Sequence, residues 1–76
     1  MVTAYILLIV KPGEESVVAE KLRKMNEVKD VSVVYGEYDI IAKVEGKDMQ
    51  GLQNFLIKHI RALDQIERTS TMISLK

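Results

Sequence analysis

The 76-residue sequence has no cysteine, no tryptophan and a single histidine. Without cysteine, it can form neither a disulfide bond nor a thiolate metal site. His59 stands alone beside the apolar stripe of a predicted helix, and the sequence offers no recognisable pair of nucleophile and base. Catalytic and metal sites need clustered partners of this kind. We therefore expect a protein that is not an enzyme and that needs no cofactor.

The sequence also lacks an excess of either charge and any long apolar run. Its 11 basic and 11 acidic residues balance, whereas a nucleic-acid-binding domain usually carries a basic excess. No apolar run reaches the roughly 18 residues that a membrane span requires. The apolar stretch from Tyr5 to Val10 has neither a basic leader nor a cleavage site of small residues. We expect a cytoplasmic protein that contacts neither nucleic acid nor a membrane directly.

The short chain is expected to form one domain, residues 1–76, with a small core. A domain of this size buries only about 60–65% of the surface that its unfolded chain exposes. The burial of its own core then barely offsets the entropy lost on folding. Apolar residues still make up 47% of the sequence, which is enough to supply a subunit interface as well. Self-association is therefore predicted from composition alone.

Apolar periodicity predicts four strands and two helices. The strands are β-branched apolar runs, and the helices carry apolar residues three and four positions apart. Pro12-Gly13 separates the first strand from the first helix, and Asp48 is the predicted N-cap of the second helix. The predicted strands span residues 3–10, 28–35, 38–44 and 66–75, and the helical stripes are Val18, Leu22 and Met25, then Met49, Leu52, Leu56, Ile60 and Leu63.

This β-α-β-β-α-β order predicts an α+β ferredoxin-like sandwich. With right-handed crossovers, one four-stranded antiparallel sheet carries both helices on one face, and the first and third strands are central. Both faces of the first strand are apolar, one with Tyr5, Leu7 and Ile9 and the other with Ala4, Ile6, Leu8 and Val10. The helices can cover only one face, so we expect a second copy of the sheet to cover the other.

The stretch between the two middle strands, Tyr35-Gly36-Glu37-Tyr38-Asp39, carries a polar pattern. A glycine between β-branched runs predicts a hairpin turn, and Gly36 can expose its backbone N–H at positive φ. A carboxylate beside exposed N–H groups suits a small zwitterion, because Asp39 would bind an ammonium and the N–H groups a carboxylate. An ordinary hairpin, in which Asp39 bonds its own turn, explains the same residues. Strand alternation places Asp39, Ile41 and Lys43 on the sheet face that meets a partner or solvent.

The last predicted strand brings three hydroxyl groups close together in Thr69-Ser70-Thr71. The β-propensity of a half-exposed strand explains them without any ligand. However, the element order, the Gly-x-Tyr-Asp pattern of Gly36 to Asp39 and this Thr-x-Thr pattern together resemble one family over essentially the whole chain. It is the RAM ("regulation of amino acid metabolism") domain of Lrp/AsnC-type transcriptional regulators.

The resemblance implies sheet-to-sheet homodimers that assemble further, commonly into rings, and that bind a free amino acid between dimers. Gly36 and its neighbours would offer N–H groups, Asp39 would bind the ammonium, and the last strand would line the pocket. The implied site comprises Tyr35, Gly36, Glu37, Tyr38 and Asp39 from the loop and Thr69, Ser70, Thr71 and Met72 from the last strand.

Full-length members of this family begin with a helix-turn-helix domain, which the sequence does not contain. The resemblance therefore implies a regulatory module that acts through effector binding, self-assembly or co-assembly with full-length regulators. Three alternatives remain: a structural oligomerisation subunit without a ligand, an ACT-type sensor with the same strand order, and a small ferredoxin-like enzyme using Glu37 and Asp39 as paired carboxylates. The identity of the amino acid cannot be read from the sequence.

Overall fold

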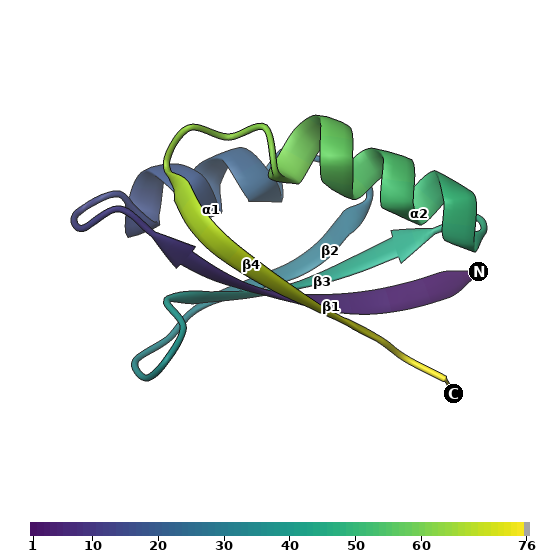
Figure 1. Cartoon of the computed structure of the whole chain (residues 1–76), viewed down its shortest axis with the longest axis horizontal. Helices are drawn as coiled ribbons and strands as arrows, with labels where there is room; N and C mark the ends of the chain where they lie inside the picture. Colours follow the sequence, from purple (N-terminus) through teal and green to yellow (C-terminus); the bar gives the residue numbers. More distant parts are fainter. Residues whose placement is uncertain (76) are drawn as a thin grey trace.

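The computed structural model describes residues 1–75 and has the predicted ferredoxin-like architecture. Four antiparallel strands form one sheet in the order β2-β3-β1-β4, and two helices lie on one of its faces (Figure 1). The elements are β1 (Val2–Val10), α1 (Glu15–Arg23), β2 (Val28–Val33), β3 (Ile40–Gly46), α2 (Met49–Phe55), a π-helical turn η1 (Leu56–Ile60) and β4 (Ile66–Ile73). The first and third strands are central, as the sequence predicts.

The core lies between the helices and the sheet. Side chains on the helix-facing side of β1 and β3 are buried, namely Ala4, Ile6, Leu8, Val10, Ile40, Ala42 and Val44. They meet Val18 and Leu22 of α1 and Leu52, Leu56 and Ile60 of the second helical segment in a single cluster. Alternation in the strands and helical spacing in the helices therefore select the same core, as the sequence predicts.

The second helix begins with an ordinary N-cap but ends in a widened turn. The side chain of Asp48 accepts a hydrogen bond from the Gly51 backbone N–H at 2.7 Å, which is the predicted N-cap. At the other end the Arg61 N–H donates to the Leu56 carbonyl at 2.8 Å. This i→i+5 bond widens the last turn into η1, a feature the periodicity did not predict. Met49, predicted to lie in the buried stripe, is 43% exposed.

The connection between β2 and β3 is longer than predicted. The strands were expected to run to residue 35 and from residue 38, but β2 ends at Val33 and β3 begins at Ile40. The Val34 N–H donates to the Asp39 carbonyl at 2.8 Å, which leaves residues 35–38 to close the hairpin, and the Asp39 N–H donates to the Leu8 carbonyl of β1 at 2.8 Å. Asp39 is therefore tied to β1, and residues 34–39 form an open loop rather than a tight hairpin turn. Because Asp39 lies outside β3, strand alternation does not assign its side chain to either face of the sheet.

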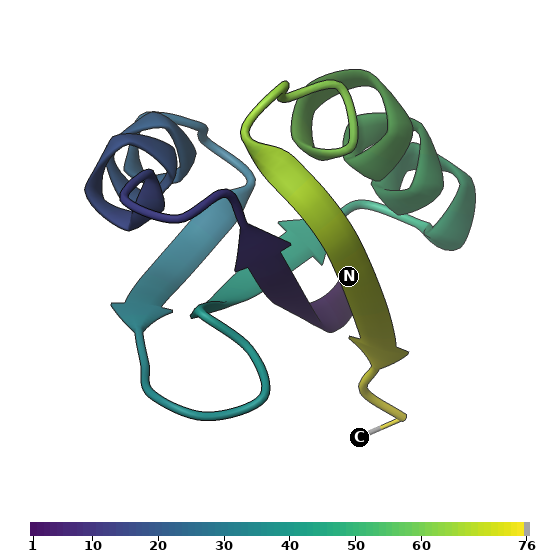
Figure 2. The same cartoon turned by 60° about the vertical axis from the view of Figure 1, so that its left-hand side comes forward.

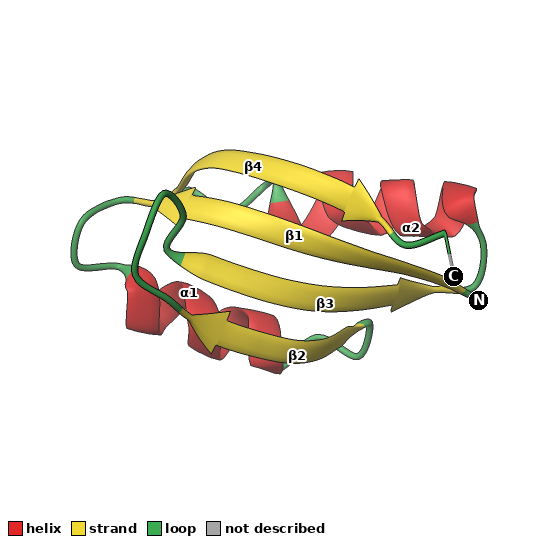
Figure 3. Cartoon of the chain, turned by 90° about the horizontal axis from the view of Figure 1, so that it is seen from below, coloured by secondary structure: helices red, strands yellow, loops and turns green. Residues whose placement is uncertain are grey.

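The second face of the sheet carries no helix among residues 1–75 (Figure 3). Tyr5 of β1, Ile41 of β3 and Met72 of β4 are 39%, 36% and 54% exposed. The strand register sets Met72 beside Tyr5, and Leu7 between Ile41 and Ser70. This open face, defined by these residues, lies on the two central strands and β4; it is largely apolar and also carries Lys43, which lies opposite Tyr5.

Within residues 1–75, no helix is long and apolar enough to cross a membrane.

Candidate ligand site

Asp39 holds the loop of residues 34–39 to β1, and the tip of the loop is exposed to solvent. The Asp39 Oδ2 accepts a hydrogen bond from the Val10 N–H at 2.9 Å, at the end of β1. The Val34 N–H donates to the Asp39 carbonyl at 2.8 Å and closes the base of the loop. The carboxylate thus bonds a neighbouring strand rather than its own turn, which differs from the ordinary-hairpin interpretation of the sequence.

The tip of the loop projects from the end of the sheet (Figure 2). Gly36 has φ of +146°, a conformation that suits glycine. An added Cβ at Gly36 would meet no atom within 4 Å, so the backbone there is approachable. Tyr35 is fully exposed and Glu37 is exposed as well, whereas Tyr38 and Asp39 are half-buried. The loop therefore presents a glycine backbone and an aromatic ring to solvent, above an anchored carboxylate.

A recess of about 440 Å³ lies beside this loop and contains the Asp39 side chain. Its lining residues are Glu15, Val33, Val34, Tyr35 and Asp39. Glu15 comes from the first turn of α1. Glu15, Val33 and Val34 were not predicted as site residues. No local pattern marks them, because only the packing of α1 against the sheet brings Glu15 to this loop.

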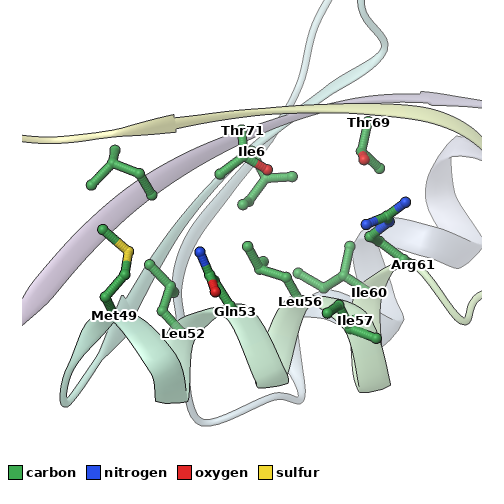
Figure 4. A pocket seen from close by; sticks show the side chains of 11 residues that line it. Ile6, Met49, Leu52, Gln53, Leu56, Ile57, Ile60, Arg61, Thr69 and Thr71 are labelled. Atoms are coloured by element: carbon green, nitrogen blue, oxygen red, sulfur yellow. The ribbon is translucent and has the colours of Figure 1, made fainter.

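The candidate residues of β4 are divided between the two faces of the sheet. Thr69 and Thr71 face the helices and line a groove of about 560 Å³ beneath α2 (Figure 4). Ser70 and Met72 pair with Leu7 and Tyr5 and belong to the open face. Strand alternation thus places Thr69 and Thr71 on one face and Ser70 and Met72 on the other, so the three hydroxyl groups, although close in sequence, do not share one face within a single chain.

The loop and the Thr-x-Thr pattern do not meet within one chain. The recess at Asp39 and the groove beneath α2 have no lining residue in common. The fold thus presents two separate concave sites, one with a carboxylate and one with threonine hydroxyl groups.

The described part of the chain, residues 1–75, has no group of three or more His, Cys, Asp or Glu side chains that could hold a metal ion. His59 is exposed and lies against the ring of Phe55, with ring centroids 5.3 Å apart. Its position is explained by this aromatic contact on the outer side of the second helical segment.

Comparison with known proteins identifies relatives over almost the whole chain. Residues 3–76 match the family described as "Lrp/AsnC ligand binding domain". The HTH-type transcriptional regulator FL11 of Pyrococcus furiosus is 40% identical over 99% of this chain and 49% of its own length. This chain therefore spans about half the length of that curated relative. A homocitrate synthase of Saccharolobus islandicus is 41% identical over 78% of this chain but only 13% of its own length.

Solved structures support the same relationship. The crystal structure of FFRP-DM1 is 49% identical, has a TM-score of 0.97, and matches over 99% of this chain and all of that one. The E. coli AsnC structure is 32% identical, with a TM-score of 0.93 over 99% of this chain and 51% of that one. The four-stranded sheet and its two helices are thus the arrangement found in AsnC.

Proposed function

Because this chain belongs to the Lrp/AsnC ligand-binding domain family, we propose that it is an amino-acid-binding, self-assembling regulatory module. Its relative FL11 is a transcriptional regulator, and the chain corresponds to about half of that protein. The module would act in the cytoplasm through its effector and its assembly state rather than through nucleic-acid contacts of its own. The observation that carries the proposal is the solvent-open recess lined by Asp39, beside the loop that exposes the Gly36 backbone.

The recess suits the two charged ends of an amino acid. Val10 uses one oxygen of Asp39, Oδ2, and a carboxylate has about four lone-pair sites. Asp39 can therefore hold an ammonium while it remains anchored to β1. Exposed N–H groups around Gly36 would bind the ligand carboxylate, as such backbone concavities do for anions. Val33, Val34 and Tyr35 offer apolar surface to the ligand side chain.

Assembly is part of the proposed function. The open face of the sheet exposes Tyr5, Ile41 and Met72, and a second copy of the same face would bury them in a two-fold dimer. The loop of residues 34–39 projects away from the sheet (Figure 2) and is free to contact a neighbouring dimer. An amino acid bound there would lie between dimers of a ring-like oligomer, with Ser70, Met72 or the threonines of β4 supplied by another chain.

We expect a full-length regulator to pair with this chain through the same open face. Because FL11 is 40% identical over this chain, a full-length relative would present a closely similar sheet to the open face. Mixed dimers of this type would change the number of DNA-binding domains in an assembly. Co-purification of the chain with such a regulator, lost when Ile41 is replaced by lysine, tests this part of the proposal.

The direct test is a screen of the common amino acids by thermal unfolding, followed by circular dichroism because the chain has no tryptophan. A ligand at 100 times its Kd raises the free energy of unfolding by about 2.7 kcal/mol, which shifts Tm by several degrees in a domain of this size. We expect the shift in the wild type and in an Asp64→Asn control, an exposed aspartate in the turn before β4. We expect none in Asp39→Asn, which keeps an oxygen for Val10 but lacks the charge.

The screen also separates the alternatives. If no amino acid shifts Tm, the sensor proposal fails, and a structural oligomerisation subunit is the better description. A shift that survives in Asp39→Asn would show that an amino acid binds elsewhere and would remove Asp39 from the site.

A further inference from the structure

The strand β2 forms one edge of the sheet, and within residues 1–75 no strand lies on its outer side (Figure 3). An edge strand presents unpaired N–H and C=O groups with which another chain can pair. Its second half belongs to the run Val31-Ser32-Val33-Val34-Tyr35, which has no charge, no proline and high β-propensity. Val33 is 51% exposed and Tyr35 is fully exposed. This run, the 31–35 segment, therefore has the composition that favours strand addition between copies of a chain.

The hydrogen bonds at the end of β2 show which backbone groups of the 31–35 segment point outward. The Val34 N–H donates to the carbonyl of Asp39, the residue before β3, at 2.8 Å. In an antiparallel pair, successive residues alternate between groups that bond the neighbouring strand and groups that point away from it. The N–H and C=O groups of Val31 and Val33 therefore point away from β3.

Both outward groups of Val31 are bonded to charged side chains. Its N–H donates to the Oδ1 of Asp30 at 3.0 Å, and its C=O accepts a hydrogen bond from the Nη2 of Arg23 at 3.5 Å. Arg23 is the last residue of α1, so two separate elements supply these side chains. Arg23, Asp30 and Val31 also line one shallow recess of about 230 Å³. Val31 therefore has no free donor for a neighbouring strand, and its acceptor is already bonded.

A bulge limits the same edge on the other side of Val31. The register of β2 against β3 shifts between Val28 and Asp30, and Lys29 between them is exposed. A bulge twists an edge strand away from a flat neighbour, and a lysine on the edge opposes pairing. The regular part of the edge is therefore short, and Val31 is the residue that a second strand would have to bond.

We propose that Arg23 and Asp30 close the β2 edge to β2 of a second copy, and thereby confine association to the open face of the sheet. Two pairing edges would let sheets join side by side without limit, whereas a chain with one pairing edge can add only one neighbour through it. A closed edge at β2 thus keeps an assembly of this chain finite. This inference does not require amino-acid binding, because it depends only on groups of the chain itself.

The test variant carries Arg23→Ala together with Asp30→Ala. Both side chains are exposed, so the core is kept, and the net charge stays at zero because one charge of each sign is lost. The matched control carries Lys24→Ala with Asp64→Ala, an exposed pair that makes no side-chain hydrogen bond within residues 1–75. Both proteins and the wild type are incubated at one concentration and followed by thioflavin T fluorescence and light scattering.

We expect both signals to rise several-fold above the wild type in the test variant, because stacked strands are the structure that such fibres share. The matched control should equal the wild type. Adding Val33→Lys to the test variant should abolish the rise, since the lysine lies on the pairing edge. Adding Ile41→Lys should leave the rise in place, because Ile41 lies on the open face and not on the edge.

Asp48→Ala separates edge pairing from simple unfolding. This variant loses the N-cap of α2, far from β2 in the sequence, and keeps Arg23 and Asp30. It should give no thioflavin T signal. The proposal is overturned if the test variant behaves like the wild type, if Asp48→Ala gains the same signal, or if the rise survives Val33→Lys. Loss of the rise on adding Ile41→Lys would also overturn it, because association would then run through the open face.

Discussion

Asp39 links the candidate ligand site to the stability of the fold, and its replacement has a predictable cost. The Asp39 Oδ2 accepts a hydrogen bond of 2.9 Å from the N–H of Val10, a residue only 3% exposed. In Asp39→Ala this buried N–H loses its acceptor. Leaving a buried donor unpaired costs about 2 kcal/mol, which corresponds to a fall in Tm of roughly 8–16 °C for a domain of this size.

Asp39→Asn separates this structural role from the charge. The amide oxygen can still accept from Val10, and a neutral hydrogen bond retains about half the strength of a charge-assisted one. We expect the free energy of unfolding to fall by less than about 1 kcal/mol in this variant. Glu37→Gln is the control in the same loop, because Glu37 is exposed and makes no side-chain hydrogen bond within residues 1–75. Its stability should equal that of the wild type.

The measurement is urea unfolding followed by circular dichroism without added amino acids. All variants are compared at one protein concentration, since association stabilises the folded state by mass action. The slope of the transition should stay constant while its midpoint falls in the order wild type, Asp39→Asn, Asp39→Ala. If Asp39→Ala is as stable as the wild type, the bond to Val10 does not anchor the loop. If Asp39→Asn and Asp39→Ala are equally destabilised, the charge rather than the acceptor matters.

Three further predictions concern packing, capping and assembly. Gly46→Ala should lower the free energy of unfolding by about 1–3 kcal/mol, because an added Cβ would lie 3.1 Å from the Leu52 Cα; an unchanged urea midpoint would show that α2 shifts freely. Asp48→Ala should cost about 1 kcal/mol through loss of the N-cap, whereas Asp48→Ser should restore most of it in the same assay. Ile41→Lys on the open face should yield monomers in light scattering with folded circular dichroism, because a charge would be buried in the dimer. Val17→Lys on exposed α1 is its control, and an unaltered mass for Ile41→Lys would refute dimerisation through the sheet.

Much of the fold follows from local pattern. The alternation in residues 38–44 predicts that Ile40, Ala42 and Val44 of β3 face the helices, and Asp48 marks the start of α2, because these signals depend on neighbours in the sequence. The length of the loop before β3 was mispredicted, since Asp39 bonds β1, a strand about 30 residues away that no local pattern reveals. The turn η1 has a different cause: the Leu56 carbonyl bonds Arg61, one residue beyond the α-helical partner, and apolar spacing does not distinguish this from an α-helical turn.

The candidate site was predicted only in part. The Gly-x-Tyr-Asp motif predicts Asp39 and Gly36 as site residues. In the structure Asp39 lines an open recess, and Gly36 lies in the loop beside it. Glu15 joins that recess from another element, so its presence could not be inferred from spacing. Residues that are adjacent in sequence can also be separated in space. Thr69 and Ser70 are neighbours in the chain but lie on opposite faces of the sheet.

The element order, the composition of the core and the apolar character of both faces of the first strand all follow from the order of residues along the chain. These properties rest on local propensity and hydrophobic period, which each segment carries independently of its neighbours in space. Packing of the elements sets two further features: the Asp39 carboxylate anchors a loop to β1, and the groove beneath α2 lies apart from that loop. Concave sites arise where separate elements meet, and the distances between those elements are set by packing rather than by spacing along the chain.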